Sequence, residues 1–152
     1  FCMPGWRLGW VIVPKSLQDN FMKLAQNLFI SSGNVAQFAA IEVFNCLDDL
    51  DKTVEIYKKN RDIVFDYLEN SSWNNFTRSE GAFYTFIKIP NSKKSSDSIV
   101  KKILEETAIA LTPGVDFDKV DGHRFIRLSF SSKTRDLNKG MNILQNWINK
   151  NY

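Results

Sequence analysis

The chain has 152 residues and a mass of 17.5 kDa, with a formal net charge of +3 at pH 7. Hydrophobic residues make up 43% of it and aromatic residues 13%, which suits a packed core and excludes an intrinsically disordered chain. The basic residues are scattered among acids in isolated pairs, so a nucleic-acid-binding surface is not indicated: Lys58-Lys59, Lys93-Lys94 and Lys101-Lys102.

Residues 6–13, with the sequence WRLGWVIV, predict a short strand that ends before Pro14. A nearly continuous apolar run is typical of a strand buried on both faces of a sheet that helices cover. Arg7 lies in this run beside Trp6, and an unpaired guanidinium among apolar residues is strongly unfavourable. Arg7 therefore requires an anion, either a carboxylate of this chain or a ligand.

Helices are predicted from this strand to residue 69. Ser16 is placed to cap the first, which continues to about Phe29 and carries an apolar side formed by Leu17, Phe21, Leu24 and Leu28. Residues 31–33 break it, and Asn34 begins a second, alanine-rich helix. Acidic side chains favour a helix N-terminus, so Asp48, Asp49 and Asp51 are expected to introduce a third helix, residues 53–69. One side of this helix is apolar except for Arg61.

The second half changes to alternating strands. In residues 83–89, FYTFIKI, the side chains of Phe83, Thr85, Ile87 and Ile89 face one way. The remaining elements are, in chain order, a polar loop, a helix, two strands and a final helix, at residues 90–96, 99–107, 109–112, 124–130 and from about 133. This order predicts an α+β fold in which helices pack on a small sheet, preceded by a strand and helices from the end of an α/β domain.

Arg127 is the second candidate anion site. In residues 124–130, RFIRLSF, Ile126 and Leu128 alternate onto the core face, so Arg127 lies on the opposite face. A planar guanidinium binds a carboxylate or phosphate through two parallel hydrogen bonds. An ordinary surface salt bridge within the chain is the alternative, and at this point both remain open.

No other reaction centre is indicated. Cys2 and Cys46 lie far apart and predict free thiols in a reducing compartment, which favours a cytoplasmic location. The single histidine, His123, excludes a histidine-rich metal site, and we expect no bound metal. No apolar run reaches the ~18 residues that span a membrane, and no nucleophile triad, phosphate-binding glycine loop or pair of metal carboxylates is found.

Five segments together resemble the class I/II aminotransferases, the aspartate-aminotransferase-like branch of the fold-type I pyridoxal-phosphate enzymes. They follow the order and spacing of that family and cover nearly all of the chain: MPGWRLGW, QNLFIS with NVAQFAA, GAFYTF, ALTPGVDF and FIRLSFS. The resemblance implies that residues 1–51 are the carboxyl-terminal part of a large cofactor-binding domain. Residues 52–152 would then be the small carboxyl-terminal domain.

The resemblance also implies a role for each arginine. Arg7 would contact the phosphate of pyridoxal 5'-phosphate, and Arg127 would bind the α-carboxylate of the substrate. The implied reaction moves an amino group from an L-amino acid, aspartate-like or general, to a 2-oxo acid such as 2-oxoglutarate, in a homodimer. The implied partners are these small molecules, without nucleic acid or membrane.

Two departures from the family pattern qualify this hypothesis. The family's Schiff-base lysine falls upstream of Phe1, so no catalytic residue is assigned within the chain, and the chain alone is not expected to catalyse transamination. Asp118 stands where the family's PGxxFG motif commonly has glycine. The alternatives are the same fold acting as a lyase or synthase with this cofactor, or a non-catalytic cofactor-binding or interaction module.

Overall fold

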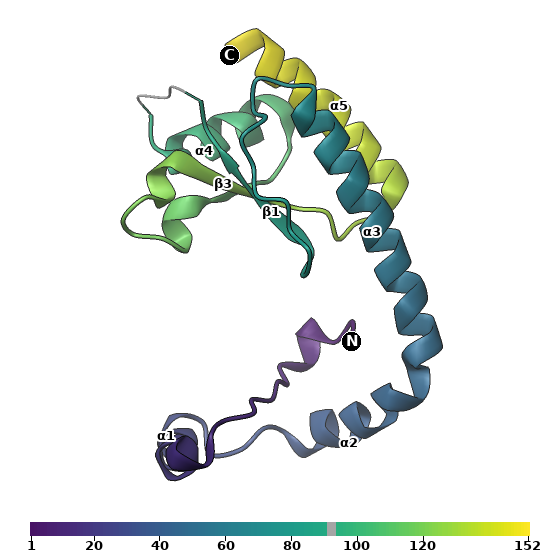
Figure 1. Cartoon of the computed structure of the whole chain (residues 1–152), viewed down its shortest axis with the longest axis vertical. Coiled ribbons are helices and arrows are strands. Elements are labelled where there is room, and N and C mark those ends of the chain that lie inside the picture. The colour runs from purple at the N-terminus through teal and green to yellow at the C-terminus, as the bar shows by residue number, and fades with distance from the viewer. Residues whose placement is uncertain (91–93) are drawn as a thin grey trace. The chain divides into compact units, whose positions relative to one another are not determined.

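The computed structural model describes residues 1–90 and 94–152 and divides the chain into two compact units, Phe1–Thr53 and Val54–Tyr152. The division falls within helix α3 (Leu47–Glu69), which is drawn in blue in Figure 1. Residues 91–93, which include Lys93 and part of the polar loop predicted at 90–96, lie outside the described residues.

A three-stranded antiparallel sheet organises the second unit. Its strands β1 (Tyr84–Lys88), β2 (Thr112–Pro113) and β3 (Phe125–Ser129) lie in the order β1-β3-β2, so β3 is central. The strands predicted at 83–89 and 124–130 are confirmed. In the strand predicted at 109–112, only Thr112 pairs with β3, and the pairing continues to Pro113. A proline is tolerated in this strand because β2 lies at the edge of the sheet.

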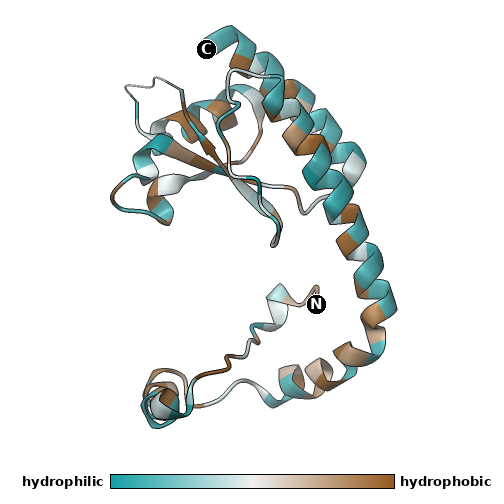
Figure 2. Ribbon diagram, viewed as in Figure 1, coloured by the Kyte–Doolittle hydropathy of each residue, from teal (hydrophilic) through white to brown (hydrophobic). Residues whose placement is uncertain are grey.

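One face of this sheet is buried by helices. Ile87, Ile126 and Leu128 join a core with residues of α3, α4 (Ser96–Thr107) and α5 (Thr134–Asn151). The apolar side predicted for the final helix is buried, and its members are Leu137, Met141, Leu144 and Ile148. Figure 2 shows hydrophobic residues along β3 and α4. The predicted α+β fold is confirmed.

A buried asparagine fixes the loop between β3 and α5. Asn60, on α3, is fully buried. Its Nδ2 donates to the carbonyls of Phe130 at 3.0 Å and Ser132 at 2.7 Å, and its Oδ1 accepts from the hydroxyl of Thr134 at 2.8 Å. The buried amide of Asn60 thus has hydrogen-bond partners inside the protein, and these bonds hold the end of β3 and the start of α5 against α3.

A close backbone contact fixes the turn between β2 and β3. Gly114 and Gly122 approach so closely that a Cβ on Gly114 would lie 2.4 Å from the carbonyl oxygen of Gly122. The same oxygen accepts a hydrogen bond from the Ser96 hydroxyl at 3.0 Å, which joins the start of α4 to this turn. The Gly114 carbonyl accepts from the N–H of Phe117 at 2.9 Å and thereby sets the position of that residue.

Helix α3 begins at Leu47 rather than at the predicted Thr53. Asp48 and Asp49 therefore lie in its first turn and not before the helix. Carboxylates in the first turn also stabilise the positive end of the helix dipole. Arg61, the exception on the apolar side, pairs with Asp62 at 3.1 Å and therefore does not enter the core.

The first unit contains helices α1 (Gln18–Leu28) and α2 (Asn34–Glu42). The predicted break at residues 31–33 and the start of α2 at Asn34 are confirmed. The predicted capping by Ser16 is wrong: Ser16 lies inside a short 3-10 turn, Lys15–Leu17, and Leu17 occupies the N-cap of α1 without a side-chain hydrogen bond.

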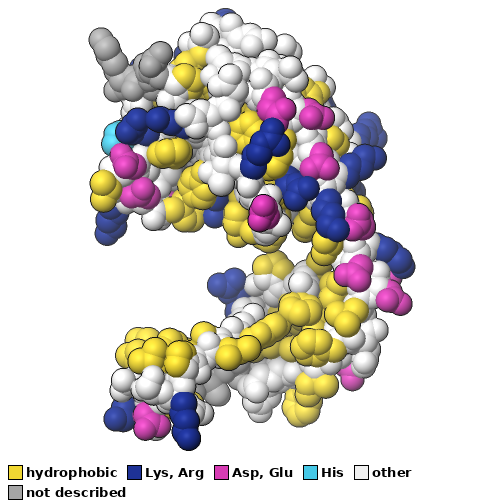
Figure 3. Space-filling model, in the orientation of Figure 1, with side chains coloured by type: hydrophobic (Ala, Val, Ile, Leu, Met, Phe, Trp, Pro, Cys, Tyr) yellow, Lys and Arg dark blue, Asp and Glu magenta, His cyan; other side chains and the backbone are white. Residues whose placement is uncertain are grey.

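The strand predicted at residues 6–13 is also wrong. Pro4–Trp6 forms a 3-10 turn, and the chain from Leu8 to Val13 is irregular, with Ile12 92% exposed. A strand is stable only when its backbone pairs with a neighbouring strand, and residues 1–53 contain none. Figure 3 shows hydrophobic side chains on the surface of this unit.

Replacing Asn60 with alanine should lower the free energy of unfolding by about 2–4 kcal/mol, because one buried and two partly buried hydrogen bonds, to Phe130, Ser132 and Thr134, are lost. Urea denaturation followed by tryptophan fluorescence measures this change. Asn142→Ala, at an exposed position on α5, is the matched control and should change stability by less than about 0.5 kcal/mol. Equal effects of the two substitutions would contradict the role of Asn60.

Gly114→Ala should destabilise the protein by more than about 3 kcal/mol, because the new methyl group would overlap the backbone of Gly122 and Phe125. Gly140→Ala is the control: Gly140 lies in α5 with open space around it, so alanine should stabilise by up to about 1 kcal/mol. The two melting temperatures should move in opposite directions. A Gly114→Ala protein as stable as the parent would show that the contact is not required.

Candidate functional site

Arg127 lies at the centre of the open face of the sheet. On the central strand β3 it is opposite Phe86 of β1 and opposite Thr112 of β2. Its neighbours in the chain, Ile126 and Leu128, are buried on the other face, which confirms the predicted alternation. Arg127 itself is half-buried, so part of its side chain remains accessible.

Two aromatic rings contact the guanidinium of Arg127. Its Cζ lies 4.5 Å from the ring centroid of Tyr84 and 4.2 Å from that of Phe117. Both distances are well inside the ~6 Å within which a cation is attracted to an aromatic face. Phe86 meets Phe117 edge-on at 5.8 Å between centroids, so the aromatic surroundings continue along β1.

The hydrogen-bonding capacity of this guanidinium is largely unused. Its Nη2 lies 3.5 Å from the Thr112 hydroxyl, at the outer limit of a hydrogen bond, and its Nε is buried without a partner. Among residues 1–90 and 94–152, no carboxylate forms an ion pair with Arg127. The salt bridge that the sequence left open is therefore not formed within the described chain. The buried Nε is closed to a ligand, but the Nη groups of this half-buried cation keep N–H donors that suit an external anion.

Asp118 closes the loop that follows Phe117. Its Oδ1 accepts from the backbone N–H of Val120 at 2.8 Å and from that of Asp121 at 3.2 Å. Its carbonyl accepts from the N–H of Gly122 at 3.1 Å. The carboxylate thus orders this loop through its own hydrogen bonds, as aspartate commonly does in turns. Asp118 is the residue at which this chain departs from the PGxxFG pattern.

Arg7 is exposed in the first unit, not buried in a strand as predicted. It adopts a left-handed backbone conformation with φ of 54°, and its Nη1 donates to the Pro4 carbonyl at 3.0 Å. No ion pair involves it within the part of the chain that the structure describes. Arg7 and Arg127 belong to different units, so the geometry of the candidate site is that of Arg127 alone.

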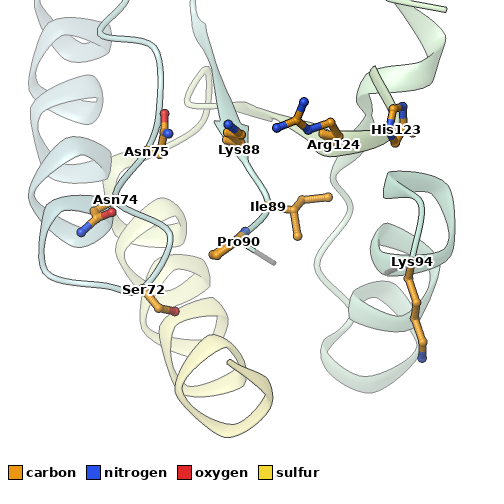
Figure 4. A pocket seen from close by; sticks show the side chains of 9 residues that line it. All are labelled: Ser72, Asn74, Asn75, Lys88, Ile89, Pro90, Lys94, His123 and Arg124. Carbon is orange, nitrogen blue, oxygen red and sulfur yellow. The ribbon is translucent and has the colours of Figure 1, made fainter. Parts of the chain in front are cut away.

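A cavity of about 440 Å³ lies where β1 ends and β3 begins. Its lining comes from the loop after α3, the end of β1, the turn before β3 and the approach to α4, and consists of Ser72, Asn74, Asn75, Lys88, Ile89, Pro90, Lys94, His123 and Arg124 (Figure 4). Arg124 already pairs with Asp121 at 3.6 Å. Arg127 and its two rings do not line this cavity. We place the candidate site at Arg127 because its guanidinium, unlike that of Arg124, has no carboxylate partner among the described residues.

The sequence identified Arg127 but not the residues around it. Tyr84 shares a face with Phe86 in the predicted alternation of residues 83–89, so pairing this strand with 124–130 would have brought it near Arg127. Phe117 gives no comparable signal, because its position depends on the contact between Gly114 and Gly122.

Some kinds of site are not seen in the described residues. Within 1–90 and 94–152, no group of histidine, cysteine, aspartate and glutamate side chains is arranged to hold a metal ion. None of the helices described there is both long and apolar enough to cross a membrane. Cys2 and Cys46 are exposed and free.

Known proteins that resemble this chain are aminotransferases. The family described as aminotransferase class I and II matches residues 1–144. The chain is 31% identical over 152 residues to an aspartate aminotransferase of Sulfurisphaera tokodaii, covering 97% of this chain and 38% of that protein. It is 29% identical over 150 residues to a valine–pyruvate aminotransferase of Mycobacterium tuberculosis, covering 97% of this chain and 39% of that protein.

The fold agrees with this likeness. The crystal structure of an aminotransferase from Mycobacterium tuberculosis matches with a TM-score of 0.85 at 29% identity, covering 97% of this chain and 39% of that one. The chain thus spans about two fifths of the length of the relatives it matches. Enzymes of this family depend on pyridoxal 5'-phosphate. With the family matched over residues 1–144, the resemblance seen in the five sequence segments is confirmed, and the chain belongs to the class I and II aminotransferases.

Proposed function

We propose that the whole protein is an aminotransferase that moves an amino group from an L-amino acid to a 2-oxo acid, and that Arg127 binds the α-carboxylate of both. One observation carries the assignment to Arg127: it is half-buried, its one described hydrogen bond is long, and it forms no ion pair in the described chain. Family membership supports the class of reaction.

A carboxylate is the anion that suits this place best. Two N–H groups of a guanidinium match the two oxygens of a carboxylate, so the bound acid is oriented as well as attracted. The aromatic rings of Tyr84 and Phe117 exclude water from part of the guanidinium, and a less polar environment strengthens an ion pair. Holding the acid at two points also orients the bond between the α-carbon and its hydrogen.

Arg7 is chemically suited to the cofactor's phosphate. Its described hydrogen bonds reach only the Pro4 carbonyl, which leaves further N–H donors for an anion. We assign the phosphate of pyridoxal 5'-phosphate to Arg7. When bound, this cofactor supplies an electron sink for the substrate's α-carbon. The contribution of this chain is to hold two anions, the phosphate and the α-carboxylate, and the lysine of the reaction is assigned upstream of Phe1.

We propose a class of amino-group donors and not a single amino acid. The two relatives are named for aspartate and for valine with pyruvate, at 31% and 29% identity, so sequence likeness does not favour one side chain. We propose aspartate or a general L-amino acid as donor and 2-oxoglutarate as acceptor, since the α-carboxylate at Arg127 is common to all of them.

The organisation of the protein is part of the same proposal. Residues 1–51 are assigned to the large cofactor-binding domain and residues 52–152 to the small domain, and the division between Thr53 and Val54 supports a boundary in this region. We expect a homodimer, as in the family, in the cytoplasm, where the exposed thiols of Cys2 and Cys46 would stay reduced.

An amino-transfer assay tests the reaction. The whole protein, supplied with pyridoxal 5'-phosphate, should form glutamate from 2-oxoglutarate when given L-aspartate or another L-amino acid, as measured by chromatography. Donor consumption without glutamate would instead support the lyase or synthase alternative. Binding of cofactor without any turnover would support a non-catalytic module.

Arg127→Ala should raise the KM for the amino acid about 10- to 100-fold, because the substrate loses charge-assisted hydrogen bonds. Steady-state kinetics with an amino acid that is active in the transfer assay measures this. Arg124→Ala is the matched control, since Arg124 immediately precedes the same strand but lines the cavity of Figure 4, and the KM of this variant should stay within about twofold. An unchanged KM for Arg127→Ala would show that the carboxylate binds elsewhere.

Arg7→Ala should weaken retention of the cofactor about tenfold or more, because a phosphate loses a guanidinium partner. Equilibrium dialysis of pyridoxal 5'-phosphate gives the dissociation constant directly. Lys23→Ala, an exposed cation on α1 in the same unit, controls for the loss of one positive charge and should have little effect. Equal cofactor affinity in the parent and Arg7→Ala proteins would overturn the assignment.

A further inference from the structure

We propose that Tyr84 and Phe117 are positioning residues, which hold the guanidinium of Arg127 ready for a carboxylate by aromatic contact instead of by an acidic partner. The proposal rests on the proposed function of Arg127 and adds to it how the arginine is oriented. It is carried by the two short distances from Cζ to the ring centroids, 4.5 and 4.2 Å.

Arg127 needs such a restraint because little else holds its end. An arginine side chain has several rotatable bonds, and ordering them on binding would weaken the affinity for a ligand. The polar contact to the Thr112 hydroxyl is long, at 3.5 Å, and Nε has no partner among the described residues. The two rings are the other interactions described for the guanidinium, and both are short, so we assign its orientation to them.

The rings are themselves held in place. Tyr84 belongs to β1 and meets the ring of Phe83 at 4.5 Å between centroids. Phe117 meets Phe86 at 5.8 Å, and its backbone N–H is bound to the Gly114 carbonyl at 2.9 Å. The two positioning residues therefore come from separate parts of the unit, a strand and a turn. Phe117 is 51% exposed, so Phe86 and Arg127 hold its ring on one side only.

An aromatic ring restrains a cation in a way that an acid cannot. A carboxylate would accept the N–H groups of Arg127 and neutralise its charge, and a substrate would then have to displace it. A ring attracts the cation through its π face and accepts no strong hydrogen bond, so the N–H donors stay available. The guanidinium of Arg127 accordingly has one long described hydrogen bond, from Nη2, and its other Nη donors stay available.

The test replaces each ring with leucine, a somewhat smaller apolar side chain without a π face. Tyr84→Leu and Phe117→Leu should each weaken the binding of succinate about three- to tenfold, the range expected when one cation–π contact is lost. Succinate carries carboxylates but no amino group, so it binds without reacting, and its inhibition constant is measured by competition with the amino-acid donor in the whole enzyme. The KM of the donor should rise in parallel, with cofactor retention unchanged.

Variants that keep the ring should rescue binding. Tyr84→Phe and Phe117→Tyr are expected to hold the succinate constant within about twofold of the parent, because the π face remains. If Phe117→Leu fails to fold, Tyr84→Leu still tests the proposal from the strand side. An equal loss of affinity in the leucine variant and the ring-keeping variant at the same position would overturn it.

Phe76→Leu is the matched control. Phe76 contacts another arginine of the same unit, Arg78, with the Cζ 5.7 Å from its ring centroid, and packs on Phe65. This variant loses a comparable aromatic contact away from Arg127, so its succinate constant should not change. Thermal unfolding of the three leucine variants shows whether a loss of affinity merely follows a loss of stability, and that outcome would overturn the proposal.

Arg127→Lys separates this proposal from the proposed function. Lysine keeps the charge but lacks the planar fork that binds a carboxylate at two points. Unchanged succinate binding in Arg127→Lys would show that Arg127 is not the carboxylate anchor, and both proposals would fail. If Arg127→Lys binds succinate more weakly while Tyr84→Leu and Phe117→Leu bind it as well as Phe76→Leu does, Arg127 remains the carboxylate anchor. The positioning role of the two rings would then be overturned.

Discussion

The pairing of β3 on both sides is the constraint on which the site depends. A strand paired with two neighbours cannot slide, and a shift by one residue would carry its buried side chains to the open face. Ile126 and Leu128 are almost completely buried, so such a shift would expose them and bury the guanidinium of Arg127. The hydrophobic core thus fixes the place of a charged group that is not part of it.

Contacts with distant parts of the sequence hold both ends of this strand. Before β3, the turn at Gly122 lies against Gly114 and receives the Ser96 hydroxyl from α4. After β3, Asn60 of α3 binds the carbonyls of Phe130 and Ser132. These contacts make a short strand rigid enough to present a side chain in one orientation, which a binding site requires.

The sequence predicted what depends on local pattern. Alternation identified β1 and β3 and put Arg127 on the open face, because side chains of a strand face opposite ways at successive positions. Periodicity likewise identified the buried side of α5. Pattern failed where structure depends on non-local contacts. Residues 6–13 look like a strand but find none to pair with in the first unit, and Phe117 reaches Arg127 only because two glycines meet.

The surroundings of Arg127 differ from those of three other arginines in its unit. Arg61, Arg78 and Arg124 each pair with a carboxylate, of Asp62, Glu69 and Asp121 respectively. Those arginines are exposed enough for water to share the charge, so the pairs contribute little to stability and leave little capacity for a ligand. Arg127 is restrained by aromatic rings and, in the described chain, by no acid. What distinguishes Arg127 from these three is that no described carboxylate pairs with it, while two aromatic rings keep it oriented and its Nη donors stay available.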